Sequence, residues 1–132
     1  MTVYLCLDDR NGLLFNGRRL SRDAYVLTDI AASVPENLTV DPFSEKLIAA
    51  AGIPCALAEG DIPEDAHFFL EKRDPDALLP LAGTLVIYRW NRLYPSDVRW
   101  EGSPEAFGFT LAQTMEFPGK SHEIITKEVY VK

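Results

Sequence analysis

The stretch from Leu78 to Arg92 reads LLPLAGTLVIYRWNR, and it decides the fold class. Asp74-Pro75, just before it, is typical of a helix start, where a capping residue precedes proline at the first helical position. Gly83 favours an end to this helix at about Ala82, because glycine is common just past helix ends. Thr84 to Trp90 is β-branched, aromatic and apolar, so it predicts a buried strand.

Similar strand-then-helix units come before this stretch. The early strands are predicted at Thr2–Leu7, Leu38–Val40 and His67–Leu70. A first helix is predicted between a capping Ser21 and Pro35, and a second between Asp41-Pro42 and Gly52. Turn signals predict loops at Asp8–Gly17 and at residues 53–66. After Arg92 the sequence predicts strands alone, around Val98–Trp100, Phe107–Glu116 and Glu123–Val131.

This order of elements indicates a single α/β domain over residues 1–132. Its sheet is expected to be parallel at first and antiparallel at the C-terminal end. Ligands of such sheets bind beyond the carboxyl ends of the parallel strands. The site is therefore expected among Asp8–Gly17, the helix start near Ser21, and the segments after Val40 and Leu70.

Composition narrows the function further. The chain carries a net charge of −7 and has a pI near 4.7, which argues against a general nucleic-acid binder or a polybasic membrane-surface protein. The longest uncharged run, Ala77–Tyr88, is far too short to cross a bilayer. The sequence predicts a soluble, cytoplasmic protein with two reduced cysteines. Only two histidines are present, so sites with three His ligands are excluded, and Ser, His and Asp occur without a GxSxG motif.

Three segments, taken in order, resemble the dihydrofolate reductases. LLPLAGTLVIYRWNR resembles a helix end and the strand that crosses the pterin site, and MEFPGKSHEIITKEVYVK at the C-terminus is similar to the final hairpin. VYLCLDDRNGLLFNGRRLSRD is similar to the first strand, the loop over the nicotinamide and the start of the first helix. The resemblance implies a three-layer α/β/α domain with a mixed, mostly parallel sheet and an antiparallel C-terminal hairpin.

The resemblance also implies two catalytic candidates, should the protein be an enzyme. Asp23 matches a carboxylate that hydrogen-bonds the pterin and supports proton delivery, whereas the residue type alone also fits a first-turn acid that favours the helix dipole. Tyr88 stands where the family has a threonine that joins this carboxylate. Its hydroxyl could reach a carboxylate or a ligand, but its ring is expected to fill part of the pterin slot.

Several departures from the family pattern fall on the NADPH site. Paired glycines that let a pyrophosphate approach are replaced by Glu71 and its neighbours, and a phosphate-gripping segment is replaced by Asp41-Pro42-Phe43-Ser44. Phe15 replaces the glycine that lies against the nicotinamide, and the chain is short between Ile53 and Ala66. We therefore expect no cofactor, and we keep an NADPH-dependent reductase of a pterin-like substrate as the alternative.

Arginines gather where a ligand is expected. Arg18, Arg19 and Arg22 stand near the first helix start, where they favour binding of a phosphate or carboxylate, or pair with the nearby acids. Ser21, Phe15 and Phe43 complete the predicted ligand-binding set.

Three functions remain open at this point. The first, which we favour, is a non-catalytic or cofactor-independent protein that binds a small anionic or heterocyclic, pterin-like ligand. The second is an enzyme, either the reductase or an acid–base catalyst built on Asp23. The third is a structural or partner-binding module. The aromatic side chains of the C-terminal half belong to the core or form a homodimer patch. They are Trp90, Tyr94, Trp100, Phe107 and Phe109.

Overall fold

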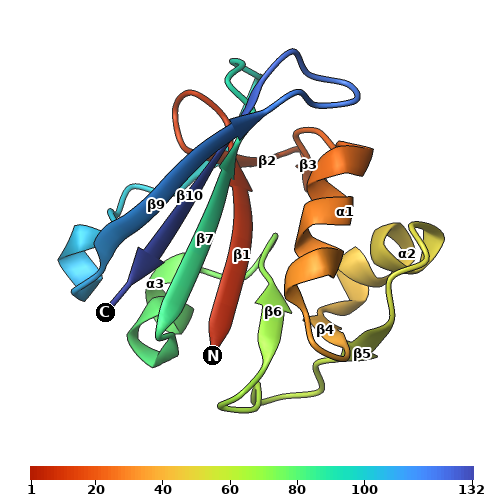
Figure 1. Cartoon of the computed structure of the whole chain (residues 1–132), viewed down its shortest axis with the longest axis vertical. Coiled ribbons are helices and arrows are strands. Elements are labelled where there is room, and N and C mark those ends of the chain that lie inside the picture. Colours follow the sequence, from red (N-terminus) through yellow and green to blue (C-terminus); the bar gives the residue numbers. More distant parts are fainter.

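A seven-stranded mixed sheet forms the centre of the computed structural model, which describes all 132 residues (Figure 1). The strand order is β5-β4-β6-β1-β7-β10-β9. The strands are β1 (Thr2–Leu7), β4 (Leu38–Val40), β5 (Cys55–Leu57), β6 (His67–Phe69), β7 (Thr84–Arg89), β9 (Thr110–Phe117) and β10 (Ile125–Val131). Within the sheet, neighbouring strands are parallel in the part β5-β4-β6-β1-β7, and β10 is antiparallel to both β7 and β9. The predicted mixed sheet with antiparallel C-terminal strands is confirmed.

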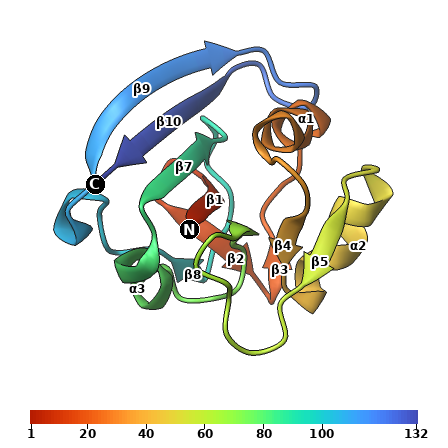
Figure 2. The ribbon, with the colours of Figure 1, turned by 60° about the horizontal axis from the view of Figure 1, so that its bottom comes forward.

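Helices cover both faces of this sheet (Figure 2). Alternate residues of a strand point to opposite faces, so β1 contributes to two separate apolar clusters. One cluster packs α1 (Ala24–Ser33) and α2 (Pro42–Ala50) against side chains such as Tyr4 and Tyr88. The other packs α3 (Pro75–Leu78) and a 3-10 turn (Leu79–Leu81) against side chains such as Val3 and Ile87. The chain therefore has the expected three layers.

A second, small sheet takes in part of the loop predicted at Asp8–Gly17. Its order is β3-β2-β8, with β2 at Gly12–Phe15, β3 at Arg18–Arg19 and β8 at Val98–Arg99. Asn16 and Gly17, with φ of 51° and 70°, form the predicted turn, but this turn joins two antiparallel strands. The predicted strand around Val98–Trp100 pairs with β2 rather than with the main sheet.

Two boundaries and one loop differ from the sequence predictions. Asp23, not Ser21, caps α1, because the Asp23 carboxylate accepts the backbone N–H of Tyr25 at 2.9 Å. The third helix ends at Leu78 and continues only as a 3-10 turn, where Pro80 has no N–H to donate. Residues 53–66 contain the edge strand β5, which has two exposed residues of three and so lacks the apolar run that marks the other short strands.

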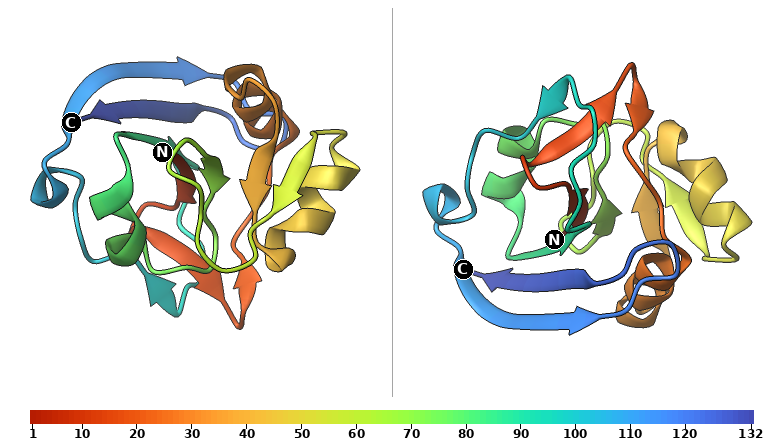
Figure 3. Two further views of the ribbon diagram at one scale, coloured as in Figure 1. Left: turned by 90° about the horizontal axis from the view of Figure 1, so that it is seen from below. Right: turned by 90° about the horizontal axis from the view of Figure 1, so that it is seen from above.

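The topology brings three segments together at one end of the sheet. The neighbours of β1 are β6 on one side and β7 on the other, so the chain order reverses at β1 and leaves a crevice beyond the strand ends. The start of α1 lies at this end, and the β9–β10 connection lies across it (Figure 3). None of the helices combines the length and apolar composition that crossing a bilayer requires.

Candidate functional site

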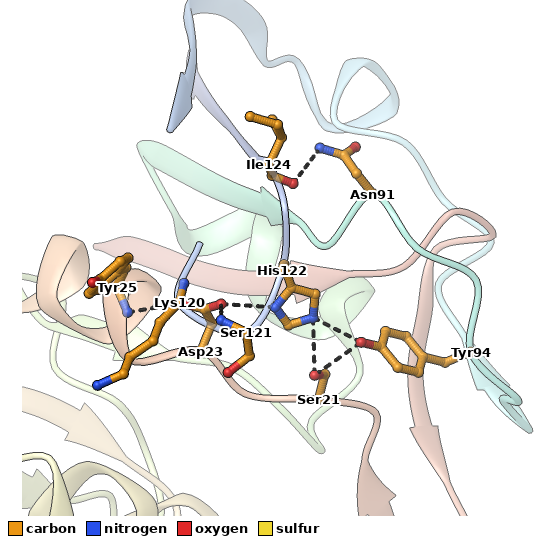
Figure 4. Close-up of polar contacts among 9 residues, drawn as sticks. All are labelled: Ser21, Asp23, Tyr25, Asn91, Tyr94, Lys120, Ser121, His122 and Ile124. Carbon is orange, nitrogen blue, oxygen red and sulfur yellow. Dashed lines mark hydrogen bonds and ion pairs between the residues drawn. The ribbon is translucent and has the colours of Figure 1, made fainter. Parts of the chain in front are cut away.

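A buried carboxylate ties the start of α1 to the β9–β10 connection (Figure 4). The Asp23 side chain is 0% exposed. Its two oxygens accept backbone N–H groups from Tyr25 at 2.9 Å, Lys120 at 3.0 Å and Ser121 at 2.8 Å. Because two of these donors come from far along the chain, the carboxylate holds two distant segments in one arrangement.

The close approach of the connection depends on Gly119. A Cβ atom at this position would lie 2.7 Å from Asp23 Oδ2 and 2.8 Å from the His122 carbonyl oxygen. Real Cβ contacts are not this short, so any other residue would push the connection away from the carboxylate.

The His122 ring lies between Asp23 and two hydroxyl groups. Its Nδ1 is 2.9 Å from Asp23 Oδ2, and its Nε2 is 2.8 Å from the Tyr94 hydroxyl and 3.2 Å from Ser21 Oγ. The ring stacks on Trp90 with 4.7 Å between centroids, and the side chain is 2% exposed. The histidine is therefore fixed in both position and orientation.

Asp23 is ionised near neutral pH. Burial by itself raises the pKa of this carboxyl, but hydrogen bonds from His122 and from the three backbone N–H groups hold its pKa at about 2. An ionised carboxylate only accepts hydrogen bonds, so the proton of a neutral His122 must lie on Nδ1. Its Nε2 then has a free lone pair directed at the hydroxyl groups of Tyr94 and Ser21.

Tyr88 does not join this cluster. Its fully buried hydroxyl donates to Asp29 Oδ2 at 2.6 Å, underneath α1. Burial, together with the Asp29 carboxylate, raises the pKa of the Tyr88 hydroxyl far above its usual range. The structure thus places Tyr88 in the apolar cluster on the α1 side of the sheet.

A narrow crevice opens beside the start of α1. It runs from Cys6 at the end of β1 to Glu71 after β6, and Ser21, Asp23 and Trp90 are among its lining residues. The space within it that the centre of a water molecule can occupy is only about 20 Å³, so the crevice is narrow between these side chains. Burial, followed by the charge of Glu71, raises the pKa of the Cys6 thiol, which makes it a poor nucleophile.

An open depression next to the crevice gathers five of the six predicted ligand-binding residues. It is lined by Arg18, Arg19, Ser21, Arg22 and Phe43. Phe15, the sixth, is 43% exposed on β2 and lies outside the depression. Ser21 lines both hollows and marks the place where they meet.

Two of the acids near these arginines, Asp8 and Asp29, are engaged elsewhere. Asp8 accepts the backbone N–H groups of Arg10, Gly12 and Tyr94, and Asp29 binds Lys127 at 2.7 Å. The ion pairs of the chain include neither Arg18 nor Arg22. Both guanidinium groups are exposed, so both remain available to an anion.

Comparison with solved structures identifies the architecture. Dihydrofolate reductase from Enterococcus faecalis, in a complex with NADP(H) and RAB-propyl, matches with a TM-score of 0.68 over 99% of this chain and 95% of that chain. This chain has the dihydrofolate reductase fold. The two sequences are 9% identical, so the likeness establishes the fold and leaves the activity open. No family model and no curated protein matches the sequence.

The reductase fold raises the question of whether the residues after β6 suit a cofactor pyrophosphate. Here Glu71 is 10% exposed, and its carboxylate accepts Arg19 Nε at 2.8 Å, Arg19 Nη2 at 2.9 Å and the Ser44 hydroxyl at 2.7 Å. The guanidinium of Arg19 also donates to the Phe43 carbonyl at 3.3 Å. A held carboxylate repels phosphate groups and already uses the nearby donors. These residues do not fit a pyrophosphate.

Sequence reasoning missed the most buried part of the site. His122 and Gly119 reach Asp23 because the β9–β10 connection folds back over the start of α1, and Tyr94, between β7 and β8, contacts His122. His122 stands 99 positions after Asp23. The one available signal was that His122 is one of only two histidines in the chain.

Proposed function

We propose that this chain binds a small aromatic anion in the depression at the start of α1, and does so without NADPH. One observation carries the proposal: Arg18 and Arg22 have no acidic partner beside Phe43, in a chain with a net charge of −7. Unpaired guanidinium groups that share a hollow are the usual means of binding a carboxylate or phosphate.

The arginines, rather than the helix, supply the attraction for an anion. Asp23 already occupies the start of α1 and accepts the N–H of Tyr25, so the helix dipole there has its negative partner. Two guanidinium groups offer paired N–H donors that match a carboxylate in geometry as well as in charge. The ring of Phe43 provides apolar surface, although Arg19 and Lys72 already lie over it at 4.9 and 4.3 Å.

The same geometry favours a protein that works without a dinucleotide. A pyrophosphate near the end of β6 would meet the Glu71 carboxylate, which already holds Arg19 and Ser44 as its partners. Making room for a pyrophosphate there would break the Arg19–Glu71 ion pair and leave a mostly buried charge without a partner, which costs about 3 kcal/mol. The NADPH-dependent reductase therefore stays the second candidate.

The test is a pair of titrations on the whole chain. Pterin-6-carboxylate, a fluorescent heterocyclic anion, serves as the probe, and NADPH is titrated separately while the fluorescence of Trp90 and Trp100 is followed. We expect saturable binding of the probe that weakens as salt is added. We expect Arg18→Ala and Arg22→Ala each to weaken it about tenfold.

Arg10→Ala is the matched control. It removes the same charge from a neighbouring exposed arginine that does not line the depression, so the affinity for the probe should stay the same. Equal weakening by all three variants would indicate attraction by net charge alone and would contradict the site. Saturable quenching of the tryptophan fluorescence by micromolar NADPH would instead support the NADPH-dependent reductase.

A further inference from the structure

Ser21, His122 and Asp23 form a continuous chain of hydrogen bonds (Figure 4). Ser21 Oγ lies 3.2 Å from His122 Nε2, and His122 Nδ1 lies 2.9 Å from Asp23 Oδ2. A hydroxyl, an imidazole and a carboxylate in this order make the hydroxyl oxygen a nucleophile, whichever fold carries them. We propose that Ser21 is an activated nucleophile that hydrolyses small carboxylic esters bearing a second, anionic group.

The proton relay is set up by the two buried members. Ionised Asp23 keeps the His122 proton on Nδ1, so the lone pair of Nε2 can accept the proton of Ser21. Stacking on Trp90 prevents the ring from turning away. Backbone N–H groups from Lys120 and Ser121 hold the carboxylate, so it orients the imidazole without moving itself.

The nucleophile lies on the open side of this relay. Asp23 and His122 are buried, whereas Ser21 is half-buried and lines the depression that holds Arg18 and Arg22. The anionic substrate class rests on the proposed function, because those arginines would bind the anionic group of the ester. The Tyr94 hydroxyl lies 2.8 Å from His122 Nε2 and donates to Ser21 Oγ at 3.2 Å, so it is part of the same hydrogen-bond cluster.

The reaction balances without any co-reactant except water. Ser21 Oγ bonds to the ester carbonyl carbon while its proton passes to His122 Nε2. The tetrahedral intermediate breaks its bond to the leaving oxygen, and that oxygen takes the proton from Nε2. Water then attacks the acyl-Ser21 ester, gives its proton to Nε2, and releases the acid as the proton returns to Oγ.

The experiment is covalent labelling with a fluorophosphonate, read by intact mass and peptide mapping, alongside hydrolysis of two nitrophenyl esters. One ester is the neutral acetate and the other the singly charged succinate. We expect one adduct on Ser21 and a succinate preference of about tenfold that Arg22→Ala removes. Ser21→Ala should abolish both the adduct and hydrolysis above background. Ser33→Ala, at the far end of α1, is the serine control.

Two further measurements keep the outcome decisive. Ser21→Cys should be alkylated by iodoacetamide faster than Cys6 and Cys55 in the same chain, because His122 activates the new thiol and burial suppresses that of Cys6. Pterin-6-carboxylate binding by Ser21→Ala separates the two proposals. Binding without any adduct on Ser21 in the parent chain overturns the nucleophile and leaves the anion site. An adduct with equal rates on both esters overturns the anionic substrate class.

Discussion

Asp23→Asn tests whether the buried carboxylate acts as a charged group. The pKa of Asp23 is about 2 in the folded chain, against an ordinary value of 3.8. At about 1.4 kcal/mol per pKa unit, this difference contributes about 2 to 3 kcal/mol to the free energy of unfolding.

The sign of the pH dependence follows from the lowered pKa. Because the folded chain holds the Asp23 proton less tightly than the unfolded chain, the contribution is complete above the ordinary value of 3.8. It is lost as the pH falls through the folded value of about 2. We calculate a loss of about 1 kcal/mol by about pH 3 and about 2 kcal/mol by about pH 2.

Urea unfolding followed by tryptophan fluorescence measures this effect. Asn keeps the shape of the side chain but not its charge, so at about pH 6 we expect Asp23→Asn to be about 3 kcal/mol less stable than the parent chain. That gap should narrow by about 1 kcal/mol at about pH 3. Asp9→Asn, which removes the same charge from an exposed residue, should differ from the parent chain by less than about 0.5 kcal/mol. A gap for Asp23→Asn that stays constant across this range would refute the reasoning.

Four other changes have definite expected outcomes. Gly119→Ala, whose Cβ would lie 2.7 Å from Asp23 Oδ2, should lower stability by about 2 kcal/mol in thermal unfolding, and an unchanged Tm would contradict the close approach. Tyr88→Phe should cost about 1.5 kcal/mol in urea unfolding, because Asp29 loses a buried donor but keeps Lys127. Glu71→Gln should cost about 2 kcal/mol by unpairing Arg19, again measured in urea. The edge strand β9 is exposed along nearly all its length and lacks the Pro and Lys residues that keep edge strands from pairing, so we expect it to pair with β9 of a second copy. Thr114→Lys should then change the molar mass measured by light scattering from that of a dimer to that of a monomer. A monomeric parent chain would rule this pairing out.

The sequence was sufficient for the sheet because burial leaves a local pattern. Thr2–Leu7 and Leu38–Val40 are strands with the predicted bounds, since an apolar run between turn signals has few other arrangements. β5 was missed because Cys55–Leu57 has two exposed residues of three and relies on its pairing with β4. A strand held mainly by its neighbour has no pattern of its own.

Part of the candidate site could likewise be predicted from local sequence, and part could not. Arg18, Arg19 and Ser21 are close in sequence, and the structure places them in one hollow. His122 reaches Ser21 only through the β9–β10 connection, and no local pattern indicates such a contact. The absence of a GxSxG motif did not exclude this contact either. A hydroxyl, an imidazole and a carboxylate can be brought together by different folds and do not require any one sequence motif.

The ionisation of Asp23 decides which chemistry this end of the sheet can perform. A carboxyl with a pKa of about 2 carries almost no proton near neutral pH, so Asp23 cannot supply one to a substrate. It can only orient His122, whose remaining nitrogen faces Ser21 and Tyr94. In the proposed reaction the proton therefore passes between Ser21 and His122 rather than through the carboxylate. In our proposals, anion binding depends on Arg18 and Arg22, which lie outside the Ser21–His122–Asp23 chain, so we expect mutations to separate the two proposed functions.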